Sequence, residues 1–151
     1  MLTILAETPD QPEIQALFVQ SEAYAAALYP PEDRHMVDAD YLGGARARFL
    51  VARWAGRAVG CGALVLGGDG TAELKRVVVD AETRGKCVGR ALMLALEAVA
   101  RTEKVRLIQL ETGPASIAAV NLYRACGYRA RGPFGAYRDS PHSLFMEREL
   151  S

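Results

Sequence analysis

A strand, a glycine-containing turn and an apolar helix follow one another near the middle of the chain, and this junction constrains the fold most. The segment 73–79 ends in three valines, and β-branched residues of this kind favour a buried strand. From Val88 to Val99, apolar residues recur at helical spacing. Between the two lies Arg84-Gly85-Lys86-Cys87-Val88-Gly89-Arg90. The chain is therefore expected to turn from a sheet into a helix here, with cations at the turn.

The first turn of such a helix suits a phosphate-bearing ligand. Its backbone N–H groups lack intrahelical acceptors and lie at the positive end of the helix dipole. Gly85 and Gly89 permit close approach to that backbone, and Arg84, Lys86 and Arg90 add positive charge. The sequence contains no Gly-Lys-Ser/Thr ending of a P-loop and no G-x-G-x-x-G fingerprint, and the glycine pair Gly60-Cys61-Gly62 lies inside an apolar strand-like run. Those two kinds of phosphate site are excluded.

Composition is that of an ordinary globular protein. The 151 residues predict a single domain over 1–151, and eighteen basic and eighteen acidic side chains cancel, so we expect no nucleic-acid or membrane partner. Three cysteines (Cys61, Cys87 and Cys126) are odd in number and lack metal-ligand spacing, which favours a reduced, cytoplasmic setting and no metal. No signal-peptide pattern is evident, and the longest apolar run, Ala58–Leu66, is too short to cross a bilayer.

Periodicity and turn residues predict ten elements. Strands are expected at 3–5, 48–54, 58–66, 71–79, 105–112, 128–131 and 143–149, and helices at 13–28, 88–102 and from a Ser116 cap to 125. The resulting order is β-α-β-β-β-α-β-α-β-β. It predicts an α/β (α+β) fold, in which a mixed central sheet of about seven strands is flanked by helices.

Two motifs and the order of elements resemble the GNAT N-acetyltransferase superfamily. Its acyl-CoA signature is Q/R-x-x-G-x-G/A, with Arg84 here at the first position and Gly89 at the last. Cys87 stands where the family has glycine; a negative φ there would be tolerated, whereas a positive φ would strain the turn and weaken CoA binding. The segment 119–128 is similar to the family's A-x-x-L-Y-x-x-x-G-F/Y run, with Tyr123 as its tyrosine.

The resemblance implies acetyl-CoA as cofactor. The CoA diphosphate would lie on the backbone of residues 85–90 and the pantetheine beside residues 77–79. Ser116 replaces an asparagine that often contacts the cofactor in the family, so its contact would be weaker or absent. The expected cofactor-binding residues are Val77, Val78, Val79, Arg84, Gly85, Lys86, Cys87, Val88, Gly89, Arg90, Ser116 and Tyr123.

Acetyl transfer to an amine needs a base, a stabilised oxyanion and a protonated leaving group. Histone-type members of the family carry their base where this chain has Glu73, and ribosomal-protein-type members carry theirs where it has Glu111. We leave the choice open, and a glutamate on a strand often simply faces water. The resemblance makes Tyr123 the acid that protonates the leaving thiolate. The alternative is that Tyr123 is a buried aromatic residue of the hydrophobic core. A backbone N–H near Val78 would meet the oxyanion.

The acceptor side carries a weaker signal. In the family, the regions around residues 29–35 and 134–138 flank the acceptor channel. Tyr29, Glu32, His35, Tyr137 and Arg138 are therefore the candidate substrate-binding residues, and their alternative is to be ordinary loop side chains.

The sequence thus predicts a bacterial, cytoplasmic N-acetyltransferase that moves an acetyl group from acetyl-CoA to a primary amine of a small molecule by direct transfer. A protein or peptide N-acetyltransferase is one alternative. A non-catalytic acyl-CoA-binding module, with Cys87 and Ser116 as marks of a decayed site, is the other. A homodimer remains open.

Overall fold

The computed structural model describes residues 1–29 and 44–151, and its elements follow the predicted order. The strands are β1 (Leu2–Ala6), β2 (Ala47–Trp54), β3 (Arg57–Leu66), β4 (Thr71–Val79), β5 (Leu107–Thr112), β6 (Arg129–Arg131) and β7 (Leu144–Glu149). The helices are α1 (Pro12–Leu28), α3 (Val88–Thr102) and α4 (Ile117–Ala125), with a short 3₁₀ turn, η2 (Ala81–Thr83), ahead of α3. None of the helices in these two ranges is long and apolar enough to span a membrane.

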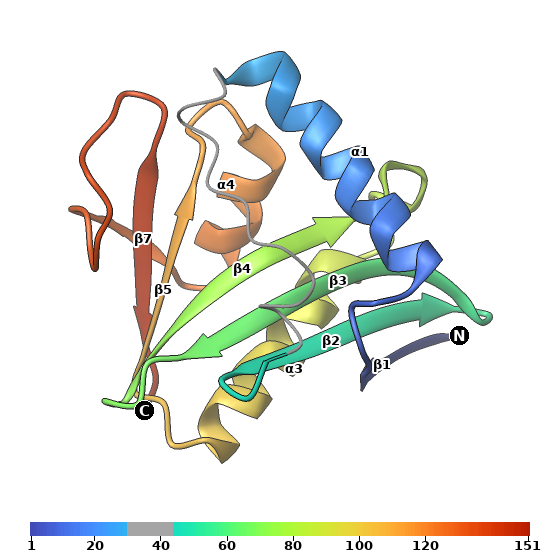
Figure 1. Ribbon diagram of the computed structural model, residues 1–151, viewed down its shortest axis with the longest axis horizontal. Coiled ribbons are helices and arrows are strands. Elements are labelled where there is room, and N and C mark those ends of the chain that lie inside the picture. The colour runs from blue at the N-terminus through green and yellow to red at the C-terminus, as the bar shows by residue number, and fades with distance from the viewer. Residues whose placement is uncertain (30–43) are drawn as a thin grey trace.

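The strands form one mixed sheet in the order β1-β2-β3-β4-β5-β7-β6. β4 and β5 run parallel, and the other neighbouring pairs run antiparallel. Figure 1 shows α1 on one face of this sheet and α3 on the other. The predicted fold class, a mixed sheet of about seven strands flanked by helices, is confirmed.

β5 and β6 begin later than the sequence predicts, because the preceding helices end in left-handed caps. Lys104 has φ +61°, and the Val105 N–H donates to Ala100 O at 2.9 Å, so β5 starts at Leu107 rather than at residue 105. Gly127 has φ +93°, and the Tyr128 N–H donates to Tyr123 O at 3.0 Å. Such bonds satisfy the last carbonyls of a helix, so these residues belong to caps and not to strands.

Alternation along the strands divides the core between the two faces. On β2, Phe49 and Val51 are buried in the cluster that contains Ile14 and Phe18 of α1. The intervening Leu50 belongs to the larger cluster that includes Leu92 and Leu96 of α3. Successive side chains of a strand point to opposite faces, so each helix is held by one half of the strand residues. The alternating side chains of β2 therefore pack against a helix on each face of the sheet.

The parallel pair β4 and β5 separates part-way along its length. Pairing covers 71–74 of β4 and 107–110 of β5, and Figure 1 shows the two strands diverging beyond that point. β4 also changes register against β3: Cys61 pairs with Val78 while Ala63 pairs with Lys75, which leaves one extra residue on β4. Arg76 sits in this bulge with φ +55°. Bulges re-aim side chains, and this one lies where the strands part.

Candidate active site

A cavity of about 710 Å³ lies where β4 and β5 diverge. Residues 73–79 of β4 form one long wall, and α1 contributes Gln20, Ser21, Tyr24 and Ala25 from one face of the sheet. The turn before α3 lines it through Arg84, Gly85 and Cys87. The remaining wall of the cavity comes from the end of β5, from α4 and from the loop before β7. A long cavity along a strand, next to a helix N-terminus, suits an extended ligand with a phosphate group.

The first turn of α3 has backbone N–H groups available for such a ligand. Its first hydrogen bond joins the Ala91 N–H to Cys87 O at 3.1 Å, so the N–H groups of residues 88–90 lie ahead of the helical ladder. A Cβ on Gly89 would lie 3.0 Å from Leu122 of α4 and 3.5 Å from Val79. Gly89 therefore lets α3 begin in close contact with β4 and α4. These features fit the CoA diphosphate that the motif implies.

Cys87 has a positive φ, which is the conformation that strains a residue with a side chain. It is the N-cap residue of α3, exposed, with φ +62°, and its side chain makes no capping hydrogen bond. The left-handed region costs a side-chain-bearing residue about 1–2 kcal/mol. Gly85, at φ +85°, carries no such cost. The turn thus needs two left-handed residues and has a glycine at only one of them.

The three cations of the turn are placed differently. Arg84 and Arg90 line the cavity. Lys86 lies outside the described lining, with its ammonium 5.6 Å from the ring centroid of Trp54 on β2. Lys86 therefore stacks on an aromatic ring in this structure, and its contact with the cofactor stays a prediction.

Tyr123 of α4 is buried and lines the cavity. Its ring centroid lies 6.0 Å from that of Tyr128. Burial, with smaller contributions from Cys126 and Glu111, raises the pKa of the Tyr123 hydroxyl well above its ordinary value. The phenol therefore keeps its proton at neutral pH, as a proton donor to a leaving thiolate requires.

Glu73 and Glu111 both line the cavity. Glu73 Oε2 lies 3.1 Å from Lys75 Nζ and accepts a hydrogen bond from the Tyr137 hydroxyl. Glu111 lies on β5, and its charge acts on Tyr123. Both carboxylates therefore remain candidates for the base.

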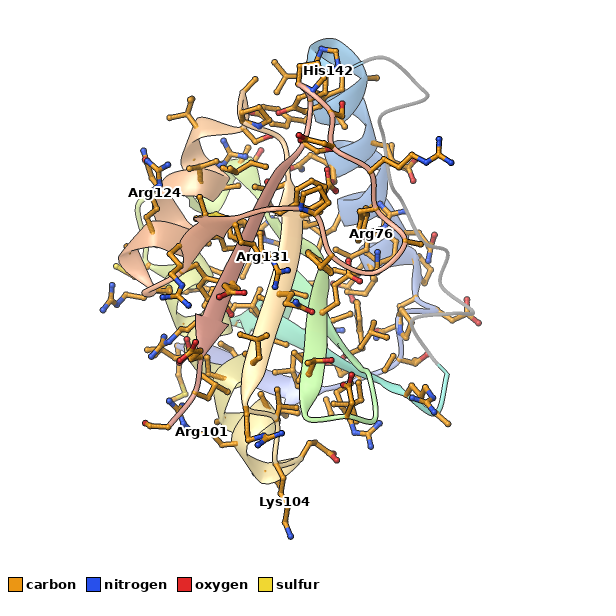
Figure 2. The ribbon with its side chains drawn as sticks, turned by 90° about the vertical axis from the view of Figure 1, so that its left-hand side faces the viewer. Arg76, Arg101, Lys104, Arg124, Arg131 and His142 are labelled. Carbon is orange, nitrogen blue, oxygen red and sulfur yellow. The ribbon has the colours of Figure 1, made fainter. Side chains whose placement is uncertain are left out.

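Tyr29 closes one part of the cavity from the C-terminal end of α1. Its hydroxyl oxygen lies 3.0 Å from Ser116 Oγ, and its ring packs edge-on against His142 at 6.1 Å. Figure 2 shows His142 beside the end of α1. Ser116 is the N-cap residue of α4, but its side chain makes no capping bond. Ser116 therefore stands at the predicted N-cap position, but its hydroxyl meets Tyr29 instead of the first turn of the helix.

Most of the predicted site residues meet at this cavity. Of the remainder, Lys86 and Arg138 are not among the residues that line the cavity, and Glu32 and His35 fall outside the described residues. Sequence reasoning missed Lys75 and His142, which also line the cavity. Lys75 carried a signal, because it lies two positions from Glu73 and therefore on the same face of a strand. His142 carried none, since its loop is placed by tertiary contacts.

Comparison with known proteins agrees with this site. A model of the acetyltransferase (GNAT) family matches residues 12–128. The IAA acetyltransferase of Azospirillum brasilense is 40% identical over 150 residues, covering 99% of this chain and 98% of the relative. A Klebsiella pneumoniae protein assigned as an acyl-CoA N-acyltransferase superposes with a TM-score of 0.85 at 36% identity, covering 100% and 99% of the two chains. PaiA N-acetyltransferase of Thermoplasma acidophilum, solved with coenzyme A, has the same fold (TM-score 0.77, 16% identity, 99% of each chain).

The chain belongs to the acetyltransferase (GNAT) family. It is an acetyl-CoA-dependent acyltransferase, and acetyl-CoA is its cofactor.

Proposed function

We propose that this protein transfers an acetyl group from acetyl-CoA directly to a primary amine of a small molecule. The observation that carries the proposal is that Glu73, Glu111 and Tyr123 line a single cavity along β4. Two carboxylates and a protonated phenol supply a base and an acid without any covalent enzyme intermediate. The 40% identity to an IAA acetyltransferase supports a small-molecule acceptor.

The residues of the turn before α3 would hold the cofactor. The N–H groups of residues 88–90 and the side chains of Arg84 and Arg90 would meet the diphosphate, and the wall formed by Val77 to Val79 would contact the pantetheine. When bound, acetyl-CoA supplies an activated acetyl thioester. We place the backbone of the bulge near Val78 beside the reacting carbonyl, where an N–H would stabilise negative charge on oxygen.

Two proton movements complete the proposed reaction. A lysine-like amine has a pKa near ~10.4, so removing its proton at pH 7 costs roughly 4–5 kcal/mol, which a nearby carboxylate and a desolvated cavity offset. Glu73 or Glu111 would bind that proton, directly or through water. Tyr123 would give its hydroxyl proton to the departing thiolate, and its high pKa keeps that proton in place beforehand.

The family assignment makes this protein an acyltransferase, and the alternative that would contradict it is a non-catalytic acyl-CoA-binding module. The left-handed Cys87 favours this module, because backbone strain in the turn before α3 is expected where a site no longer has to bind the cofactor tightly. Both the enzyme and the module would bind acetyl-CoA, but only the enzyme would transfer its acetyl group to an acceptor.

A thiol-release assay with acetyl-CoA tests the proposal. The panel should contain small primary amines, amino acids and short peptides with free N-termini or lysines. Release of CoA with one of the small amines, together with mass-spectrometric detection of the N-acetyl product, is the expected result. Acetylation of peptides alone would indicate a protein acceptor. Cofactor binding without turnover across the panel would favour the non-catalytic module.

A further inference from the structure

Three polar side chains from two distant segments form a hydrogen-bonded cluster in the cavity. Glu73 and Lys75 lie two residues apart on β4 and so share one face of the strand. Lys75 Nζ lies 3.1 Å from Glu73 Oε2 and donates to the Tyr137 hydroxyl at 2.8 Å. The Tyr137 hydroxyl in turn donates to Glu73 Oε2. The Lys75 and Glu73 side chains are only 15% and 22% exposed, so solvent screens the cluster weakly.

The loop between β6 and β7 holds Tyr137 in place through aromatic contacts. The rings of Phe134, Tyr137 and Phe145 pack against one another with centroids 5.1, 5.5 and 5.8 Å apart. Phe145 belongs to β7, which pairs with Glu111's strand β5. The hydroxyl of Tyr137 is thus fixed from the sheet rather than from a free loop, so its two bonds to β4 are built into the fold.

We propose that Lys75 is a positioning residue of the acceptor site, where its ammonium holds the Glu73 carboxylate and the Tyr137 hydroxyl in one fixed arrangement. Among the described residues, Lys75 and Tyr137 both contact Glu73 through Oε2. The carboxylate is thereby anchored through one oxygen, and Oε1 is the atom that an acceptor amine would meet. The inference rests on the proposed amine acetylation for its catalytic meaning, while the cluster itself is a property of the protein alone.

The charged groups around Tyr137 make this arrangement measurable. Glu73 and Lys75 face the hydroxyl from β4. From its own loop and from β7, Tyr137 packs against Phe134 and Phe145, which do not titrate, and the Arg131 guanidinium lies 5.6 Å from the Phe134 ring. An adjacent ammonium favours the phenolate form of a tyrosine, and an adjacent carboxylate disfavours it. Removing either partner should therefore move the ionisation of Tyr137, in opposite directions.

The first test uses the protein without cofactor or acceptor. Tyrosine labelled with carbon-13 at Cζ is followed by NMR through alkaline pH, and Tyr137→Phe assigns the Tyr137 signal. Lys75→Met should shift the Tyr137 midpoint to higher pH, and the isosteric Glu73→Gln should shift it to lower pH.

The second test uses an acceptor amine found in the thiol-release panel. Lys75→Met should lower kcat by on the order of 10²-fold, the loss that a misplaced reacting group causes, with little change in the KM for acetyl-CoA. Lys75→Arg should restore most of it, since a guanidinium reaches both partners. Lys104→Met is the matched control: Lys104 is exposed and lies at the other end of the molecule from His142 of the cavity in Figure 2, so its loss should leave activity unchanged.

Identical Tyr137 midpoints in the wild-type protein and Lys75→Met would overturn the cluster, whatever the activity assay finds. If Lys75→Met does not fold, the Glu73→Gln midpoint decides in the same way. Shifted midpoints with wild-type kcat in Lys75→Met would overturn the positioning role. Shifted midpoints with no acceptor in the panel would support the cluster and count against the proposed function, so the two failures are distinguishable.

Discussion

The hydroxyl of Tyr29 occupies the space into which a side chain at Gly113 would project. A Cβ built on Gly113 would lie 1.8 Å from the Tyr29 hydroxyl oxygen and 2.0 Å from Cζ. Gly113 follows β5, and Tyr29 follows α1, so this contact joins two segments 84 residues apart, and both residues line the cavity. A residue with any side chain at 113 therefore displaces Tyr29.

Gly113→Ala should displace the Tyr29 ring, break its bond to Ser116 and cost about 1–3 kcal/mol of unfolding free energy, because an overpacked site must shift. Urea denaturation measures the loss. Gly132→Ala is the control, since a Cβ there meets nothing within 4 Å, and it should leave the midpoint unchanged. Equal midpoints for the two variants would show that Tyr29 is not held against Gly113.

Cys87→Gly should stabilise the fold by about 1 kcal/mol, since glycine adopts the left-handed conformation at φ +62° without the strain of a side chain. Affinity for CoA should also rise, which isothermal titration calorimetry would detect. Cys87→Ala removes the thiol and keeps the strain, so it should match the wild type in both measurements. A marked loss of affinity in both variants would mean that the thiol itself binds the cofactor.

Acetyl-CoA should raise the melting temperature of the wild-type protein, because it binds the folded state. The double variant Arg84→Ala, Lys86→Ala should reduce this thermal shift. The two single variants, measured beside it, separate the contribution of Arg84 from that of Lys86. Arg84 lines the cavity, whereas Lys86 stacks on Trp54. The Arg84 variant should therefore account for most of the lost thermal shift and of its salt dependence. The opposite ranking would place Lys86 on the diphosphate when the cofactor is bound.

Arg53 should make the fold sensitive to acid. It bonds Glu7 at 2.9 Å and Glu13 at 3.0 Å, and the hydrogen bonds from Arg53 are the largest cause of the lowered pKa of each carboxyl. A lowered folded-state pKa contributes stability above the ordinary value near 4.5, and this stability is lost as pH falls through the folded value.

Arg53→Met should therefore lose stability at neutral pH and show a weaker decrease between about pH 5 and pH 3 than the wild type. Urea midpoints recorded across that range measure the slope. Arg124→Met, at an exposed position of α4, should keep the wild-type slope. Parallel slopes for the wild type and Arg53→Met would contradict the assignment.

The sequence predicted the parts of the fold that depend on local patterns. The strand at 71–79 and the helix at 88–102 have the predicted bounds, because a valine run and a strongly amphipathic repeat are both local signals. The bulge at Arg76 was not predicted, since it depends on the register between β3 and β4. Motif spacing likewise identified Tyr123 and the turn before α3, while the contacts Tyr29–Gly113 and Lys75–Tyr137 join segments that only the folded sheet brings together.

Tyr123→Phe provides the most direct test of the proposed acid. The substitution removes one hydroxyl from a buried ring, so folding and the thermal shift with CoA should be preserved. Without a positioned proton donor the thiolate leaves more slowly, and kcat should fall by roughly 10²-fold or more, with little change in KM. Burial keeps the Tyr123 pKa high, so wild-type kcat should show no loss from phenol ionisation below about pH 10, the ordinary value for tyrosine.

Tyr128→Phe is the matched control for that experiment. Tyr128 is equally buried, its ring lies 6.0 Å from that of Tyr123, and its hydroxyl has no hydrogen-bond partner among the described residues. Its kcat should therefore stay near wild type, and its stability should not decrease, because an unsatisfied buried hydroxyl contributes nothing favourable. Comparable kcat losses in the two variants would assign the effect to packing in α4, whereas a loss confined to Tyr123→Phe would assign it to the proton on Tyr123.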